Sequence, residues 1–151
     1  MPEMITVTLR QAEAFHFETA FGGGLPDYAT DEPAPLGKGL GPSPVQMLLS
    51  AVGSCMSSSL HFAMGKFHET PGQIVTHATA TIDRDETKRL RVQAIHVTLG
   101  FAAAAASIGH LDRIAGQFDQ FCTVGAAVAR GIPIHVTLKD GEGKIVRDGQ
   151  V

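Results

Sequence analysis

Residues 41–55 read Gly-Pro-Ser-Pro-Val-Gln-Met-Leu-Leu-Ser-Ala-Val-Gly-Ser-Cys, and this stretch decides the fold. A serine between two prolines, just ahead of an apolar run, is a signal for a helix N-terminus. The run continues from residue 45 to residue 64, and its inward positions recur every three or four residues. The spacing predicts a long helix with Ser43 as its N-cap and with Cys55 buried or half-buried on its inward stripe.

The only other cysteine, Cys122, lies where two predicted helices meet. Apolar residues recur at helical spacing from Ile108 to Phe121, and a second run follows over residues 123–130. We expect a kink at Cys122, which puts this thiol at the start of the second helix, where free N–H groups and the macrodipole favour a thiolate. A thiol is a strong nucleophile at neutral pH, and two thiols can share one redox cycle.

Strands are predicted on both sides of these helices. Alternating apolar and polar residues mark them at residues 5–10, 13–19, 74–83, 90–101, 132–139 and 144–147. Residues 28–40 are rich in turn formers and are expected to be an irregular approach to the long helix. The order of elements predicts an α+β fold with antiparallel sheets and a long central apolar helix. A length of 151 residues suits a single domain, residues 1–151.

Composition and charge argue against several classes of function. The net charge is −3, the pI is near 6.1, and the chain has one Tyr and no Trp, so the basic and aromatic surface of a nucleic-acid-binding protein is missing. The apolar run contains Gln46, His61 and five serines, and we interpret it as a core helix, not a membrane span. The N-terminus has no basic segment followed by an apolar one, so we expect a cytoplasmic protein with reduced thiols.

None of the seven histidines stands in a metal-binding spacing such as His-x-x-x-His. His77, His96 and His135 alternate with apolar residues in predicted strands, which is typical of outward positions on a half-covered sheet. We therefore expect no metal site and no cofactor.

The chain resembles the OsmC/Ohr family of osmotically inducible and organic-hydroperoxide-resistance proteins in three segments. These are residues 41–55, Phe-Cys-Thr-Val-Gly-Ala-Ala-Val at 121–128, and the following strand Ile-Pro-Ile-His-Val-Thr-Leu. The family's members are antioxidant, peroxiredoxin-like thiol peroxidases of the oxidative stress response. The resemblance implies an intertwined homodimer with the thiol sites at the subunit interface. The long apolar helix, with its serine-rich faces, agrees with such a partner.

The resemblance also implies a role for each cysteine. Cys55 attacks an organic hydroperoxide, Cys122 resolves the resulting sulfenic acid as a disulfide, and a small dithiol or a lipoylated protein reduces that disulfide. In this mechanism, Phe62, Phe118 and Phe121 line an apolar pocket for the alkyl group of the substrate.

Two charged residues of the family pattern are missing here. The glutamate that the family holds ten residues before its first cysteine is Val45, and no arginine occurs between Arg10 and Arg84. Without a cation, the pKa of a cysteine in the middle of a helix should stay near or above about 8.5, which predicts weak or altered peroxidase activity. Replacement groups to consider are Lys38, His61, Arg84, Arg89 and Arg91.

Two other hypotheses stay open. The same fold can serve as a non-peroxidatic protein that binds an apolar ligand or acts as a slow thiol redox sensor, which the missing charges favour. A purely structural dimeric domain is the third reading, because buried free cysteines often act as small apolar residues. Its cysteines would resist alkylation until the chain unfolds.

Overall fold

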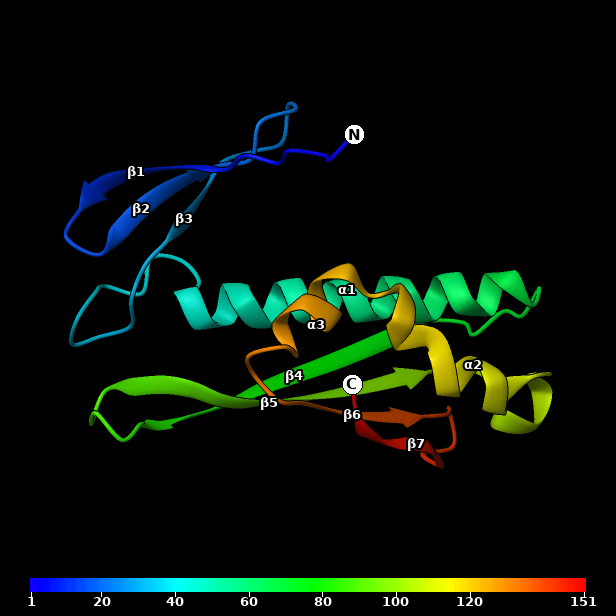
Figure 1. Ribbon diagram of the computed structural model, residues 1–151. Coiled ribbons are helices and arrows are strands. Elements are labelled where there is room, and N and C mark those ends of the chain that lie inside the picture. Colours follow the sequence, from blue (N-terminus) through cyan, green and yellow to red (C-terminus); the bar gives the residue numbers. More distant parts are fainter. The chain divides into compact units, whose positions relative to one another are not determined.

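The structure is a computed structural model that describes residues 1–151. The chain forms two compact units, Met1–Leu48 and Leu49–Val151. The elements, with η denoting a 3-10 helix, are β1 (Thr8–Glu13), β2 (His16–Ala20), β3 (Tyr28–Thr30), α1 (Pro44–Lys66), β4 (Ile74–Arg84), β5 (Leu90–Phe101), η1 (Ala105–Ser107), α2 (Leu111–Gln117), η2 (Phe118–Phe121), α3 (Thr123–Val128), β6 (Ile134–Lys139) and β7 (Ile145–Gln150) (Figure 1).

The first unit contains a three-stranded antiparallel sheet in the order β1-β2-β3. The predicted N-terminal hairpin is confirmed, but its turn lies at Ala14 and Phe15, later in the chain than expected. Ala14 takes a positive φ of 48°, and β1 is exposed along its whole length, so no buried face marked the register in the sequence. β3 was expected to be irregular, because three residues among turn formers carry no period.

A buried aspartate organises the segment between β3 and α1. Asp31 is 3% exposed, and its carboxylate accepts the backbone N–H groups of Glu32, Lys38 and Leu40 at 2.8, 3.0 and 3.2 Å. The Lys38 ammonium donates to Glu13 at 2.8 Å, within the same unit. This approach to α1 is irregular, as predicted, and it is held by hydrogen bonds.

The long helix α1 begins with a reciprocal cap. The Ser43 N–H donates to the side-chain oxygen of Gln46 at 2.8 Å, and the Gln46 N–H donates to the Ser43 hydroxyl at 3.3 Å. This pair of bonds is a capping box, with glutamine in place of the more common glutamate. The predicted helix is confirmed, and it runs for 23 residues.

The second unit contains a four-stranded sheet in the order β4-β5-β6-β7. The β4–β5 and β6–β7 pairs are antiparallel, and the β5–β6 pair is parallel. A parallel pair needs a long crossover, and the segment from η1 to α3 supplies it. The α+β fold is therefore confirmed, with one parallel pair that strand periodicity could not reveal.

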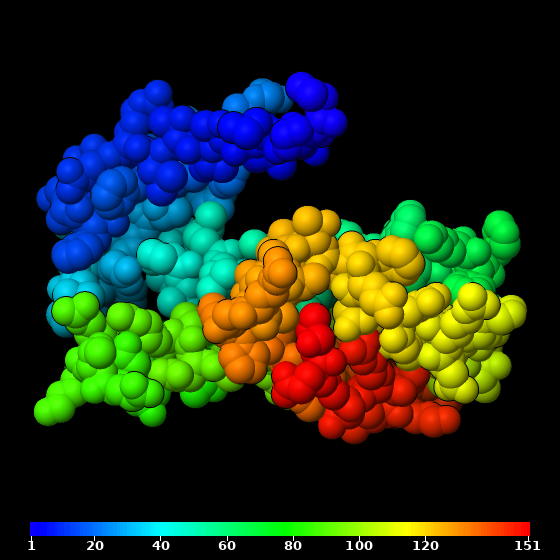
Figure 2. Space-filling model, in the orientation of Figure 1, coloured from blue at the N-terminus to red at the C-terminus, as the bar shows by residue number.

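The core of the second unit lies between this sheet and its helices. Side chains that face the helices alternate along β5 and β6 and are almost fully buried: Ile95, Val97, Leu99, Ile134, Val136 and Leu138. α1 contributes Val52, Met56, Leu60, Ala63 and Met64 to this core. Figures 1 and 2 show α3, in orange, lying over α1 on the helical side of the sheet.

By length and composition alone, α1 could cross a membrane. Its buried stripe, however, packs on the sheet, where a Cβ on Gly53 would touch Thr76 and Ala78 at 3.6 and 3.8 Å. The Ser57 hydroxyl also shares a hydrogen bond of 2.6 Å with the Thr76 hydroxyl. These contacts are those of a core helix.

The crossover contains the predicted kink. The backbone of Cys122 is extended, with φ −89° and ψ 93°, between η2 and α3. The predicted helix that ends at this cysteine is divided into α2 and η2, whereas the short helix after it is confirmed as α3.

The capping box gives a first testable prediction. We expect Ser43→Ala to lower the free energy of unfolding by about 1 kcal/mol, because the Gln46 N–H loses its acceptor. Chemical denaturation measures this change. Ser50→Ala, on an exposed position of the same helix, is the control and should change stability by less than about 0.5 kcal/mol. Equal effects of the two substitutions would contradict the capping role.

Candidate functional site

The structure brings Cys55 and Cys122 together within the second unit. Cys55 lies near the middle of α1, and Cys122 lies at the kink that precedes α3. Both are free thiols, and Cys55 is partly exposed, whereas Cys122 is fully buried. Each thiol changes the pKa of the other through a side-chain hydrogen bond, so the two sulfur atoms are neighbours.

Cys122 is the N-cap of α3. Its sulfur accepts the backbone N–H of Gly125 at 3.1 Å, as an N-cap oxygen does in other helices. A Cβ at position 125 would stand 2.7 Å from this sulfur and 2.9 Å from the terminal methyl of Met56. With any other residue at this position, the Cys122 sulfur or the end of the Met56 side chain would have to shift.

The N-terminus of α3 stabilises the thiolate form of Cys55. Burial alone would raise the pKa of Cys55, but hydrogen bonds from the backbone N–H of Val124, the Cys122 thiol, and the N–H groups of Gly125 and Thr123 outweigh it. The pKa of Cys55 is consequently lowered. The position of Cys55 within α1 gave no sign of this effect, because the N-terminus that acts on it belongs to α3 and not to α1.

Cys122 shows the opposite shift. Burial, and then the hydrogen bond with Cys55, raise the pKa of Cys122 to about 11. The sequence predicted that the start of α3 would favour a thiolate at Cys122, and this is wrong. The amides of α3 lower the pKa of the neighbouring cysteine instead, and Cys122 remains a thiol at neutral pH.

Three of the five groups suggested by the sequence have partners within their own units. Lys38 pairs with Glu13, as described above. At the tip of the β4–β5 hairpin, Arg84 donates to the Lys88 carbonyl at 2.6 Å, and Arg91 pairs with Asp85 at 3.2 Å. His61 is exposed on α1.

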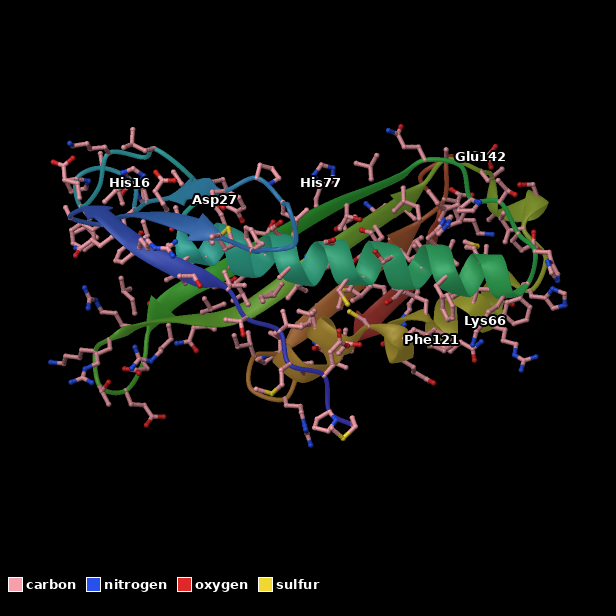
Figure 3. The ribbon with its side chains drawn as sticks, turned by 90° about the horizontal axis from the view of Figure 1, so that it is seen from above. His16, Asp27, Lys66, His77, Phe121 and Glu142 are labelled. Atoms are coloured by element: carbon pink, nitrogen blue, oxygen red, sulfur yellow. The ribbon has the colours of Figure 1, made fainter.

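Two aromatic rings stand on the same side of α1 as Cys55. Phe62 follows Cys55 by two helical turns, and its ring meets that of Phe121 edge to face at 5.3 Å. The Lys66 ammonium lies 4.9 Å from the first ring centroid and 4.3 Å from the second (Figure 3). Both rings are partly exposed, at 52% and 37%. Phe118, which was expected to line the same pocket, is instead fully buried in the core.

The outward histidines form a polar cluster on the other face of the sheet. The His96 ring bonds to Thr137 at 2.9 Å, and both Thr137 and His135 bond to Asp148, at 2.7 and 2.8 Å. No group of three or more His, Cys, Asp or Glu residues is arranged to hold a metal ion.

The family described as OsmC-like protein matches residues 37–137 of the chain, which include both cysteines. A search of curated proteins gives no match.

Solved structures share the fold at low sequence identity. A putative osmotic stress induced and detoxification response protein from Psychrobacter arcticus is 18% identical, with a TM-score of 0.74 over 91% of this chain and 98% of that one. An OsmC like protein from Mycoplasma pneumoniae is 14% identical, with a TM-score of 0.74 over 93% and 99%. The organic hydroperoxide resistance protein OhrB of Bacillus subtilis is 13% identical, with a TM-score of 0.69 over 91% and 98%.

The opposite pKa shifts predict unequal reactivity of the two thiols. In the reduced, folded protein, iodoacetamide should alkylate Cys55 at about pH 8 while Cys122 stays unmodified, because only thiolates react. The rate at Cys55 should rise with pH to a midpoint below that of an ordinary cysteine, since its pKa is lowered. Mass spectrometry of the peptides measures both. Resistance of both thiols until the chain unfolds would instead identify inert core cysteines.

The contact at Gly125 predicts a steric effect. Gly125→Ala should destabilise the protein by about 1–3 kcal/mol and displace the Cys122 sulfur, because the new methyl group has no space. Gly116→Ala in α2 is the matched control, since a Cβ there meets nothing within 4 Å. The control should be neutral or should stabilise by up to about 1 kcal/mol. Thermal unfolding distinguishes the two, and a neutral Gly125→Ala would contradict the tight contact.

Proposed function

Because this chain belongs to the OsmC-like protein family, which matches residues 37–137, we propose that it is a thiol-dependent peroxidase that reduces organic hydroperoxides. One observation carries the proposal: Cys55, partly exposed and with a lowered pKa, stands beside a second, protonated thiol. The structural likeness to an organic hydroperoxide resistance protein supports the same chemistry.

In the first step, the Cys55 thiolate attacks the distal oxygen of the hydroperoxide. The O–O bond breaks, the sulfur is oxidised to a sulfenic acid, and the alkoxide leaves and takes a proton from water to become an alcohol. The amide dipoles at the start of α3 stabilise the attacking thiolate, as oriented N–H groups do in other sites.

In the second step, Cys122 gives up its proton and attacks the sulfenic sulfur of Cys55. An S–S bond forms, and the sulfenic hydroxyl leaves as water with the proton of the Cys122 thiol. An external dithiol, free or carried as lipoyl on a protein, then supplies two electrons and returns both cysteines to thiols. The raised pKa of Cys122 suits this order, because a thiol that stays protonated cannot compete for the hydroperoxide.

The exposed rings of Phe62 and Phe121 favour a substrate with an apolar group. Such a group gains free energy from contact with partly exposed rings, and hydrogen peroxide cannot make that contact. Without an arginine at the thiolate, the amides of α3 are the main stabilising groups. A full charge stabilises an anion more strongly than a peptide dipole does. We therefore expect a modest rate of hydroperoxide reduction.

The proposal also includes the assembly and the location of the protein. We infer a cytoplasmic homodimer in which residues 1–151 make up one OsmC-like domain. The exposed side of α1 carries small residues, including Ala51, Ser54 and Ser58, which allow close approach of a second copy.

A second candidate function is a slow thiol redox sensor, or a protein that binds an apolar ligand at the same rings. Val45 and the absent arginine favour it, because they remove the charged pair that the family pattern holds at its first cysteine. The amide contacts of Cys55 argue for the peroxidase.

Stopped-flow kinetics tests the proposal. The reduced protein should consume cumene hydroperoxide faster than hydrogen peroxide and faster than free dithiothreitol does. Cys55→Ser should abolish this consumption, whereas Cys122→Ser should allow a single turnover and leave a sulfenic acid without a disulfide. A rate no better than that of a free thiol, for every peroxide, would reject the peroxidase and favour the sensor.

A further inference from the structure

The segment that carries Cys122 is attached to the sheet by a buried ion pair. Arg147 on β7 donates to the Asp119 carboxylate of η2 at 2.8 Å, and the two side chains are only 17% and 10% exposed. The other four ion pairs of the chain each have at least one side chain more than a quarter exposed. Sequence patterns did not indicate this pair, because its members lie far apart in the chain.

The same guanidinium makes three further contacts. It donates to the Ala115 carbonyl in α2 at 3.0 Å and to the Gln150 carbonyl at 3.2 Å, and its central carbon lies 5.4 Å from the ring centroid of Phe118. One side chain from the last strand thus joins the end of α2 and the first two residues of η2 to β7.

Cys122 follows this fixed segment directly. Its backbone N–H donates to the Asp119 carbonyl at 3.0 Å, so the residue that pairs with Arg147 also holds the backbone of the cysteine. A disulfide tolerates little freedom, because the two Cα atoms must come within about 7 Å of each other with a defined dihedral angle. A displacement of η2 therefore moves Cys122 relative to Cys55.

We propose that Arg147 is a positioning residue that holds Cys122 where it can close the disulfide with Cys55. The proposal rests on the peroxidase function for its biological meaning. It concerns only the step in which the Cys122 thiol displaces hydroxide from the Cys55 sulfenic acid, with water as the product. Attack of Cys55 on the hydroperoxide does not involve Arg147, whose contacts all lie in β7, α2 and η2.

A buried ion pair often adds no more stability than apolar residues of similar volume, although the loss of one partner alone is costly. Arginine offers a fork of donors in fixed geometry, which can hold a carboxylate and a backbone carbonyl at once. This geometry favours a positional role.

The test compares Arg147→Met, Arg147→Lys and Asp119→Asn with wild type. One equivalent of cumene hydroperoxide is added to reduced protein, dimedone traps the sulfenic acid, and mass spectrometry follows the disulfide. We expect an unchanged rate of Cys55 oxidation and a rate of disulfide closure lower by about ten- to a hundred-fold in Arg147→Met, because a misplacement of about 1 Å can cost a hundred-fold. Arg147→Lys should be intermediate, since one ammonium cannot replace the fork.

Arg113→Met is the matched control, because Arg113 is also an arginine at an aromatic ring, 5.4 Å from the Phe67 centroid, in α2. It should close the disulfide at the wild-type rate. Melting temperatures of all variants show whether each one folds. If Arg147→Met does not fold, the closure rate of Arg147→Lys decides the test.

Oxidation of the two thiols by diamide tests the positional role of Arg147 separately from the proposed peroxidase function. Diamide oxidises a neighbouring dithiol without any hydroperoxide, so it reports the position of Cys122 alone. If wild type does not react with cumene hydroperoxide, the peroxidase fails, and slower diamide closure in Arg147→Met still supports the positional role. Wild-type closure rates in folded Arg147→Met, with either oxidant, would overturn it.

Discussion

The pKa values of both thiols depend on the contact between the N-terminus of α3 and the middle of α1. A helix leaves its first N–H groups without partners inside the helix, and here these groups meet sulfur atoms. Gly125 donates to Cys122, and the amides at Thr123, Val124 and Gly125 act on Cys55. A Cβ at residue 125 would press on the Cys122 sulfur and on the end of the Met56 side chain, so the glycine leaves room for this close approach.

Two identical side chains acquire different properties in this contact. Both are subject to burial, which disfavours the thiolate, but Cys55 is partly exposed and receives several donors, whereas Cys122 is fully buried. Because ionisation of one thiol disfavours ionisation of its neighbour, the pair loses its first proton mainly from Cys55. Only the thiol that attacks the hydroperoxide has to be ionised at the start, so this difference agrees with the proposed order of the two cysteines.

Much of the fold was predictable because its signals are local. The long helix follows from the N-cap Ser43 between two prolines and from a three-to-four spacing, and the β4–β5 hairpin follows from clean alternation. The family resemblance is confirmed by the match over residues 37–137. The cysteines were predictable as the candidate site, but their pKa shifts were not. Spacing shows which helix a residue belongs to, and it does not show which other helix points its free amides at that residue.

The parallel β5–β6 pair and the Arg147–Asp119 ion pair were missed for a related reason, since each joins segments that are distant in sequence. Neither has a periodic signature. Charged residues at such positions look like ordinary surface residues until the fold shows that they are buried.

The amides also explain why the missing charged pair need not abolish reactivity. A glutamate at position 45 would serve to orient an arginine, and without that arginine Val45 removes no useful interaction. Helix amides are already oriented and need no second residue to hold them. They also shift the pKa less than a cation would, and this has a benefit, because the nucleophilicity of a thiolate falls as its pKa falls. The best attacking thiol has a pKa near the ambient pH, and a lowered pKa at Cys55 increases the fraction that is thiolate there.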